Sequence, residues 1–257
     1  MTMRSLAIAF CGLLLLHGGA EGLVGGAPLA TGEIARSVIG IVGPHGFFCT
    51  ATAIANDLVL TAGHCMRPGP NYKVAYRAKS GSREFFDIAV WQRPPQFTEV
   101  AKKRVTADLA ILKLTSPLPG DIGIAALGLK APSIWPGDHF TVVGGGVAVK
   151  GLRETVINRV ADLVATAPFT SLQVRLVDPS GNPVTIGACF GDSGSPVFQT
   201  QPDGTKIIAV VSWAGSNTKM RDCGGVTGAT LLSPYRPWIE DTVNKLDGAS
   251  RDHPAQN

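Results

Sequence analysis

Short apolar segments separated by glycine, proline and other turn residues recur along nearly the whole chain, and they constrain its fold more than any other feature. Such segments are typical of strands a few residues long that are joined by turns. The 257 residues include 31 glycines and 18 prolines, which is above average usage. The predicted strands form a first set at 37–42, 47–54, 58–61, 72–77, 85–91 and 110–114, and a second at 139–144, 155–164, 172–177, 196–199, 206–213 and 225–231.

The segment Ser116–Gly137 is rich in proline and glycine and separates the two sets, so it predicts a connection between two β-rich lobes. We place these lobes at about 37–118 and about 132–233. Only Pro234–Leu246 has apolar residues near helical spacing, and Asp247-Gly248 then offers a stop. The chain is therefore predicted to be all-β, with one C-terminal helix at about 235–246.

The composition excludes two classes of protein. Hydrophobic residues make up 45% of the chain and charged residues 16%, whereas a disordered chain would be more polar and more charged. The net charge is only +4, and no basic run is longer than Lys102–Arg104. We therefore expect no nucleic-acid partner.

Residues 1–22 have the pattern of a secretory signal peptide: Arg4, the short apolar run Leu6–Leu16, and then small residues. Cleavage after Ala20 and cleavage after Gly22 both fit, and the first would leave a dipeptide pro-segment. The apolar run is too short to span a bilayer comfortably. We expect a secreted protein, extracellular or periplasmic, that has no membrane partner once the signal is removed.

Signal removal leaves four cysteines, and an even number in an exported chain predicts two disulfides. Four cysteines allow three connectivities. The pairs Cys49–Cys65 and Cys189–Cys223 close short loops and give each half of the chain one bridge. No C-x-x-C pair occurs, so we expect no zinc site. Calcium is an open alternative, but no acidic loop requires it, and we predict no metal site.

Three motifs carry residues suited to acyl transfer, which needs a nucleophile, a base, an anion that orients the base, and donors for the oxyanion. The first is Thr61–Cys65 (TAGHC), in which a disulfide cysteine follows His64. The second is Asp108–Leu112 (DLAIL), in which a carboxylate opens an apolar strand and is expected to be half buried. The third is Gly191–Pro196 (GDSGSP), in which glycines on both sides of Ser193 allow a tight turn with an exposed hydroxyl.

In this order the three motifs resemble those of trypsin-like (chymotrypsin-fold) serine peptidases, and the similarity covers roughly Leu23 to Leu246. The resemblance implies two antiparallel six-stranded β-barrels within one peptidase domain, 23–257, with the catalytic residues between them. It also implies that Ser193 is the nucleophile, His64 the base and Asp108 the orienting anion. The N–H groups of Gly191 and Ser193 would form the oxyanion hole.

Two further segments resemble this family. Leu23–Gly26 (LVGG) is similar to the mature N-terminus, whose freed amino group would pair with Asp192. The resemblance places Gly187 and Ala188 at the base of the primary specificity pocket, Ser212–Ala214 along the substrate backbone, and Gly225 on the far wall.

The specificity implied by these pocket residues is neutral. Gly187 supplies no carboxylate for a basic side chain, and the methyl group of Ala214 should narrow the pocket mouth. We expect small or medium apolar side chains at P1, the substrate residue before the scissile bond. The run from Gly215 to Asp222 exceeds that of trypsin and leaves Asp222 as an alternative acidic group.

The resemblance therefore predicts a secreted serine endopeptidase that needs no cofactor. We expect it to be monomeric, to act on proteins or peptides, and to have protein inhibitors as further partners. The alternative is a catalytically silent homologue that acts as a binding or adhesion module, but the presence of all three catalytic residues disfavours it. An esterase with a G-x-S-x-G elbow does not fit, because Ser195 occupies the last glycine position.

Overall fold

Six strands close into a barrel in the first half of the chain. The computed structural model describes residues 22–99, 107–146, 157–182, 185–216 and 223–248. Neighbouring strands of this barrel are antiparallel and follow the order β1-β2-β3-β6-β5-β4, after which β4 pairs with β1. Fully buried aliphatic side chains, including Ile39, Leu60 and Ile111, fill its interior. The bounds are β1 Val38–Val42, β2 Phe48–Ala53, β3 Leu58–Thr61, β4 Lys73–Arg77, β5 Arg83–Gln92 and β6 Ala110–Leu114.

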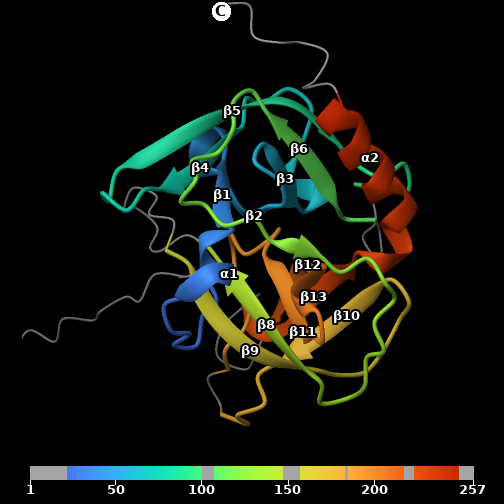
Figure 1. Ribbon diagram of the computed structural model, residues 1–257. Helices are drawn as coiled ribbons and strands as arrows, with labels where there is room; N and C mark the ends of the chain where they lie inside the picture. Colours follow the sequence, from blue (N-terminus) through green and yellow to red (C-terminus); the bar gives the residue numbers. More distant parts are fainter. Residues whose placement is uncertain (1–21, 100–106, 147–156, 183–184, 217–222, 249–257) are drawn as a thin grey trace, which may run out of the picture.

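A second six-stranded antiparallel barrel follows, and Figure 1 shows it below the first. Its strands follow the order β11-β8-β9-β10-β13-β12, and β12 pairs with β11 to close the ring. A short strand, β7, lies parallel to β12 and comes from the predicted connection between the lobes. The bounds are β7 Ala126–Leu127, β8 His139–Gly144, β9 Arg159–Ala165, β10 Gln173–Val177, β11 Pro196–Gln201, β12 Gly204–Ser216 and β13 Gly224–Leu231.

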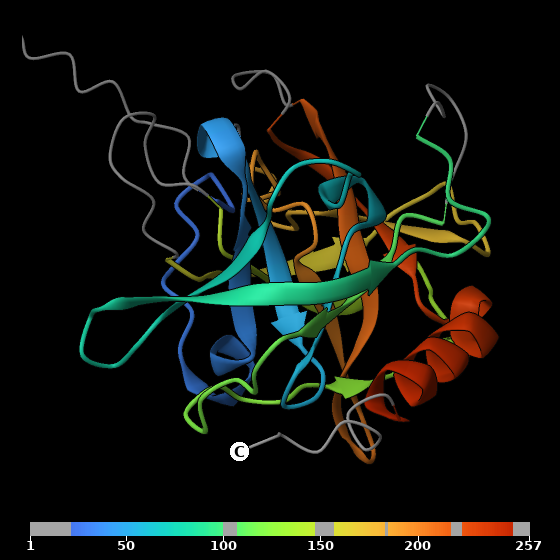
Figure 2. The same cartoon turned by 90° about the horizontal axis from the view of Figure 1, so that it is seen from above.

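A segment at each end of the described chain packs on the barrel that is more distant from it in the sequence. Helix α2, Arg236–Gly248, follows the second barrel but packs on β3 and β6 of the first, where Ile239 and Leu246 are buried. Both views place α2 on the outside of the first barrel (Figure 1, Figure 2). Leu23 and Ala27 precede the first barrel but are buried in the core of the second. Because each of these terminal segments packs on the more distant barrel, they hold the two barrels against each other.

The predicted fold class is confirmed: the described chain forms two six-stranded antiparallel barrels and a C-terminal helix. The strands predicted at 58–61, 110–114 and 139–144 have the bounds of β3, β6 and β8. The strand predicted from 155 begins only at Arg159. Helix α1, Gly32–Arg36, was not predicted, because five residues with one buried side chain are too short to show an apolar period.

Several predicted features lie outside the described residues, namely signal-peptide residues 1–21, the basic run 102–104 and Asp222. Within the described ranges, no helix has the length and apolar character needed to cross a membrane.

Candidate active site

His64 and Asp108 meet beside the first barrel. His64 lies in a 3₁₀ turn, η2 (Gly63–Cys65), close after β3, and Asp108 comes just before β6, the neighbour of β3. His64 Nδ1 lies 2.8 Å from Asp108 Oδ2, and the His64 backbone N–H donates to Asp108 Oδ1 at 2.8 Å. These two contacts orient the imidazole ring and favour the tautomer in which Nδ1–H donates to the carboxylate, which leaves Nε2 able to accept a proton.

The Asp108 carboxylate is more deeply buried than the expected half-buried position. Its side chain is 4% exposed, against 35% for His64. Burial acts to raise the pKa of Asp108, but the hydrogen bond and charge of His64, together with the hydroxyl of Ser212, outweigh it and lower that pKa. Ser212 belongs to β12, so the second barrel helps to keep this first-barrel carboxylate ionised.

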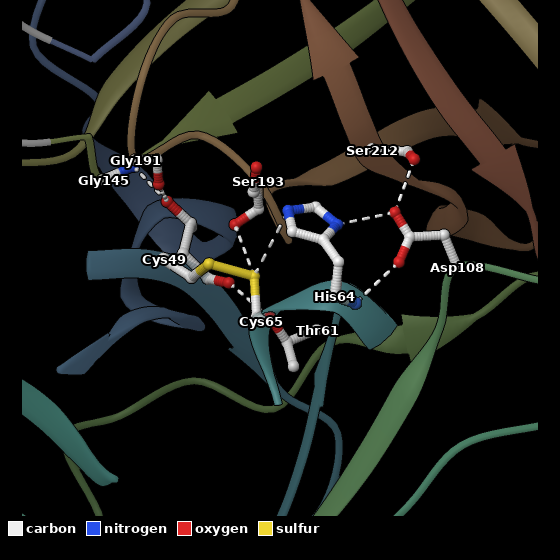
Figure 3. The surroundings of a disulfide bond; sticks show 10 residues. Cys49, Thr61, His64, Cys65, Asp108, Gly145, Gly191, Ser193 and Ser212 are labelled. Atoms are coloured by element: carbon white, nitrogen blue, oxygen red, sulfur yellow. Dashed lines mark hydrogen bonds and ion pairs between the residues drawn. A yellow bond between two sulfur atoms is a disulfide. The ribbon is translucent and has the colours of Figure 1, made fainter. Parts of the chain in front are cut away.

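Ser193 lies on the Nε2 side of the His64 ring, opposite Asp108 (Figure 3). The hydrogen bond from Ser193 Oγ to His64 Nε2 is not formed within the described residues. Catalytic hydrogen bonds often tighten only when substrate binds. The turn around Ser193 requires glycine, because Gly194 has φ +90° and a Cβ there would lie 2.0 Å from the Thr50 carbonyl oxygen.

Two buried threonines that the sequence analysis missed join the Ser193 turn to the first barrel. The Thr50 N–H donates to the Ser193 carbonyl at 2.8 Å, and Thr50 Oγ1 donates to the Gly191 carbonyl at 2.8 Å. Thr61 Oγ1 donates to the Thr50 carbonyl at 2.7 Å. The available signal was their place inside apolar predicted strands, because buried hydroxyls require partners.

Leu23 and Asp192 also lie together, and both are 0% exposed. The Leu23 nitrogen donates to Asp192 Oδ2 at 2.7 Å, and the Cys189 amide donates to the same oxygen at 2.8 Å. Burial raises the pKa of Asp192 to about 6, although the amides of Leu23, Cys189 and Gly146 oppose that shift. Gly22 is still bonded to Leu23 here, so the donor is a peptide N–H and not the free ammonium that the resemblance implies.

The residues expected at the base of the specificity pocket approach one another closely. Gly187 forms an isolated bridge with Val24, and the Ala188 amide donates to Thr227 Oγ1 at 3.0 Å. A Cβ added to Gly187 would lie 3.0 Å from the carbonyl oxygen of Gly225. Backbone atoms therefore leave little room for a side chain at position 187.

The segment expected to run along the substrate backbone is anchored from both sides. Ser212 points its hydroxyl at Asp108, so its side chain serves the His64–Asp108 pair. Trp213 Nε1 donates to Gln173 Oε1 at 3.3 Å, and the Arg175 guanidinium lies 5.6 Å from the centroid of the Trp213 ring. Ala214 pairs with Thr227 across β12 and β13 and packs against the core of the second barrel.

Two disulfides are present, Cys49–Cys65 and Cys189–Cys223, as in the short-loop pairing. The first ties β2 to the turn that carries His64, and the second ties the segment before Ser193 to the start of β13. His64 and the sulfurs of Cys49 and Cys65 lie close together (Figure 3). Because both sulfurs are disulfide-bonded, they cannot supply the thiolates that a metal ion would need.

The comparisons with known proteins agree with this geometry. The family model described as Trypsin matches residues 23–239. A vitellin-degrading protease of Bombyx mori is 28% identical over 240 residues, covering 87% of this chain and 86% of that protein. A trypsin of Xenopus laevis is 26% identical over 245 residues, covering 86% and 90%.

The solved structure of neuropsin, a serine protease expressed in mouse brain, has a similar fold. It superposes with a TM-score of 0.65 at 17% identity and covers 85% of this chain and 99% of its own. The family match spans both barrels, and the relatives include trypsins. The chain therefore belongs to the trypsin family, and it is a serine endopeptidase with the chymotrypsin fold.

Proposed function

We propose that this endopeptidase cleaves peptide bonds with the triad His64, Asp108 and Ser193. The observation that carries the proposal is the position of the His64 ring, which is bonded to Asp108 through Nδ1 and faces Ser193 through Nε2 (Figure 3). Ser193 Oγ attacks the carbonyl carbon of the scissile bond while His64 takes the hydroxyl proton. His64 then gives this proton to the leaving amine, and water releases the acyl group from Ser193 by the same route.

The charges that develop during this reaction, one positive and one negative, each have a partner of opposite polarity in the site. Asp108 stabilises the imidazolium that His64 becomes during each proton transfer. The N–H groups of Gly191 and Ser193 donate to the substrate carbonyl oxygen as it gains negative charge. Removal of residues 1–22 would turn the Leu23 nitrogen into an ammonium facing Asp192, the residue next to Gly191.

The proposed preference at P1 is for small or medium apolar side chains. It is supported by the absence of a carboxylate at Gly187 and by the close approach of Gly187 to the Gly225 carbonyl. Asp192, the acidic residue next to Ser193, accepts a hydrogen bond from the Leu23 nitrogen, so we do not assign its carboxylate to the pocket. We further propose that the protein is secreted, acts as a monomer on proteins or peptides, meets protein inhibitors, and has no nucleic-acid or membrane partner.

A fluorophosphonate that reacts with activated serines tests the triad. The processed wild-type protein should be labelled at Ser193, whereas Ser193→Ala and His64→Ala should not be labelled at a comparable rate. Peptides that differ only at P1 (Ala, Val, Leu, Phe or Arg) test the pocket. A folded, processed protein that never reacts would contradict the triad, and preferred cleavage after Arg or Lys would contradict the neutral pocket alone.

A further inference from the structure

Every polar atom of Thr50 has a partner. Thr50 lies in β2 and is 0% exposed. Its backbone N–H donates to the Ser193 carbonyl, and its own carbonyl accepts from Thr61 Oγ1. Its hydroxyl donates to the Gly191 carbonyl at 2.8 Å and accepts from the Gly145 N–H at 3.1 Å. A threonine hydroxyl has one proton to donate, and here that proton is directed to the second barrel.

Gly191 and Ser193 carry the two N–H groups proposed to bind the oxyanion, and Thr50 holds the carbonyl of each. A hydrogen bond to a carbonyl restrains the ψ angle of its residue, and with it the peptide planes of the turn. Gly191 depends on this restraint most, because it has φ +89° and no side chain to limit its backbone. Its carbonyl is held by the Thr50 hydroxyl, from a residue 141 positions away in the sequence.

The second partner of the hydroxyl lies in the wall around Asp192. Gly145 stands between Gly144 and Gly146, and Cβ atoms on these two glycines would lie 2.2 Å and 3.0 Å from Asp192 Oδ1. Figure 3 shows Gly145 beside Gly191, on the far side of Ser193 from Asp108. The Thr50 hydroxyl therefore connects the backbone around Asp192 to the backbone of the oxyanion turn.

We propose that the Thr50 hydroxyl is a positioning group for the oxyanion hole, acting through the Gly191 carbonyl on the Gly191 N–H. Thr50 is buried beneath the turn, so it acts on catalysis only through these backbone groups. This inference rests on the proposed triad and oxyanion hole. It predicts that loss of the hydroxyl weakens binding of the transition state more than binding of the substrate.

The test compares Thr50→Val, which keeps the shape and removes the hydroxyl, with Thr50→Ser, which keeps the hydroxyl. Thr230→Val is the matched control, because Thr230 is also 0% exposed and its hydroxyl has no hydrogen-bond partner within the described residues. Rates are normalised to the amount of Ser193 that fluorophosphonate labels, so a fraction of unfolded protein does not affect them.

Thr50→Val should lower kcat about tenfold with KM nearly unchanged, less than the 10²- to 10³-fold expected when an oxyanion donor is lost outright. A peptide aldehyde, whose adduct with Ser193 carries an oxyanion, should lose affinity by the same factor. A peptide product, which carries no such group, should bind as before. Thr50→Ser and Thr230→Val should both retain wild-type kcat.

The inference is overturned if Thr50→Val loses thermal stability but keeps kcat and aldehyde affinity within about twofold of wild type. It is also overturned if Thr50→Ser is as slow as Thr50→Val. Should Thr50→Val fail to fold, Thr50→Ala must show the same loss of kcat. Failure of the wild-type protein to react at Ser193 would instead contradict the proposed function, so the two failures are distinguishable.

Discussion

Asp192 should give the uncleaved chain a pH dependence that the processed chain lacks. In the uncleaved chain its partner is the Leu23 peptide N–H, and burial raises its pKa from 3.8 to about 6. The folded protein then holds this proton more tightly than the unfolded chain does. The stability associated with the protonated carboxyl is present below pH 3.8 and is lost as the pH rises through about 6.

The size of the effect follows from the shift. Each pKa unit corresponds to about 1.4 kcal/mol, so the free energy of unfolding of the uncleaved chain should fall by about 3 kcal/mol between about pH 4 and pH 7. In a chain that begins at Leu23, an ammonium faces the carboxylate and offsets the burial of its charge. The fall attributable to Asp192 should then largely disappear.

We would measure urea unfolding of wild type and of Asp192→Asn across this pH range. The difference between the two proteins isolates the contribution of Asp192 to the free energy of unfolding, since all other groups titrate equally in both. In the uncleaved form, wild type should lose about 3 kcal/mol relative to Asp192→Asn as the pH rises. In the processed form the two pH profiles should run nearly parallel. Parallel profiles in the uncleaved form would refute the reasoning, because the buried carboxylate would then carry no penalty for ionisation.

Three other substitutions test single contacts. Ser212→Ala removes a hydrogen bond to Asp108 worth about 1 kcal/mol. The value of kcat should fall about fivefold, and the acid limb of the pH–rate profile should move to higher pH. An unchanged profile would show that Ser212 does not support the Asp108 carboxylate. Gly194→Ala places a Cβ 2.0 Å from the Thr50 carbonyl oxygen at φ +90°, so unfolding should become easier by more than about 3 kcal/mol; a loss below about 1 kcal/mol in urea titration would contradict that clash. The double change Cys189→Ala and Cys223→Ala should cost about 2–4 kcal/mol of stability, measured by urea unfolding under non-reducing conditions, and equal stability would show that this bridge does not stabilise the second barrel.

Most of the strands, and the residues proposed to carry the reaction, could be predicted from the amino-acid sequence. Glycine, proline and short apolar runs act locally, so the strands at 58–61, 110–114 and 139–144 could be placed to the residue. His64, Asp108 and Ser193 were recognisable because each lies in a short contiguous motif that resembles one family. Both the strands and the motifs could be predicted because each is formed by residues that are neighbours in the sequence.

The distant residues that contact those groups could be identified only in the folded chain. Thr50 meets Gly191 across 141 positions and Ser212 meets Asp108 across 104, and neither hydroxyl has a local signal that names its partner. The packing of α2 on the first barrel and of Leu23 in the second is equally invisible along the chain. A buried polar group must form a hydrogen bond, and its partner is whichever group the packing of the two barrels brings within reach. That partner depends on the three-dimensional packing and cannot be read from neighbouring residues.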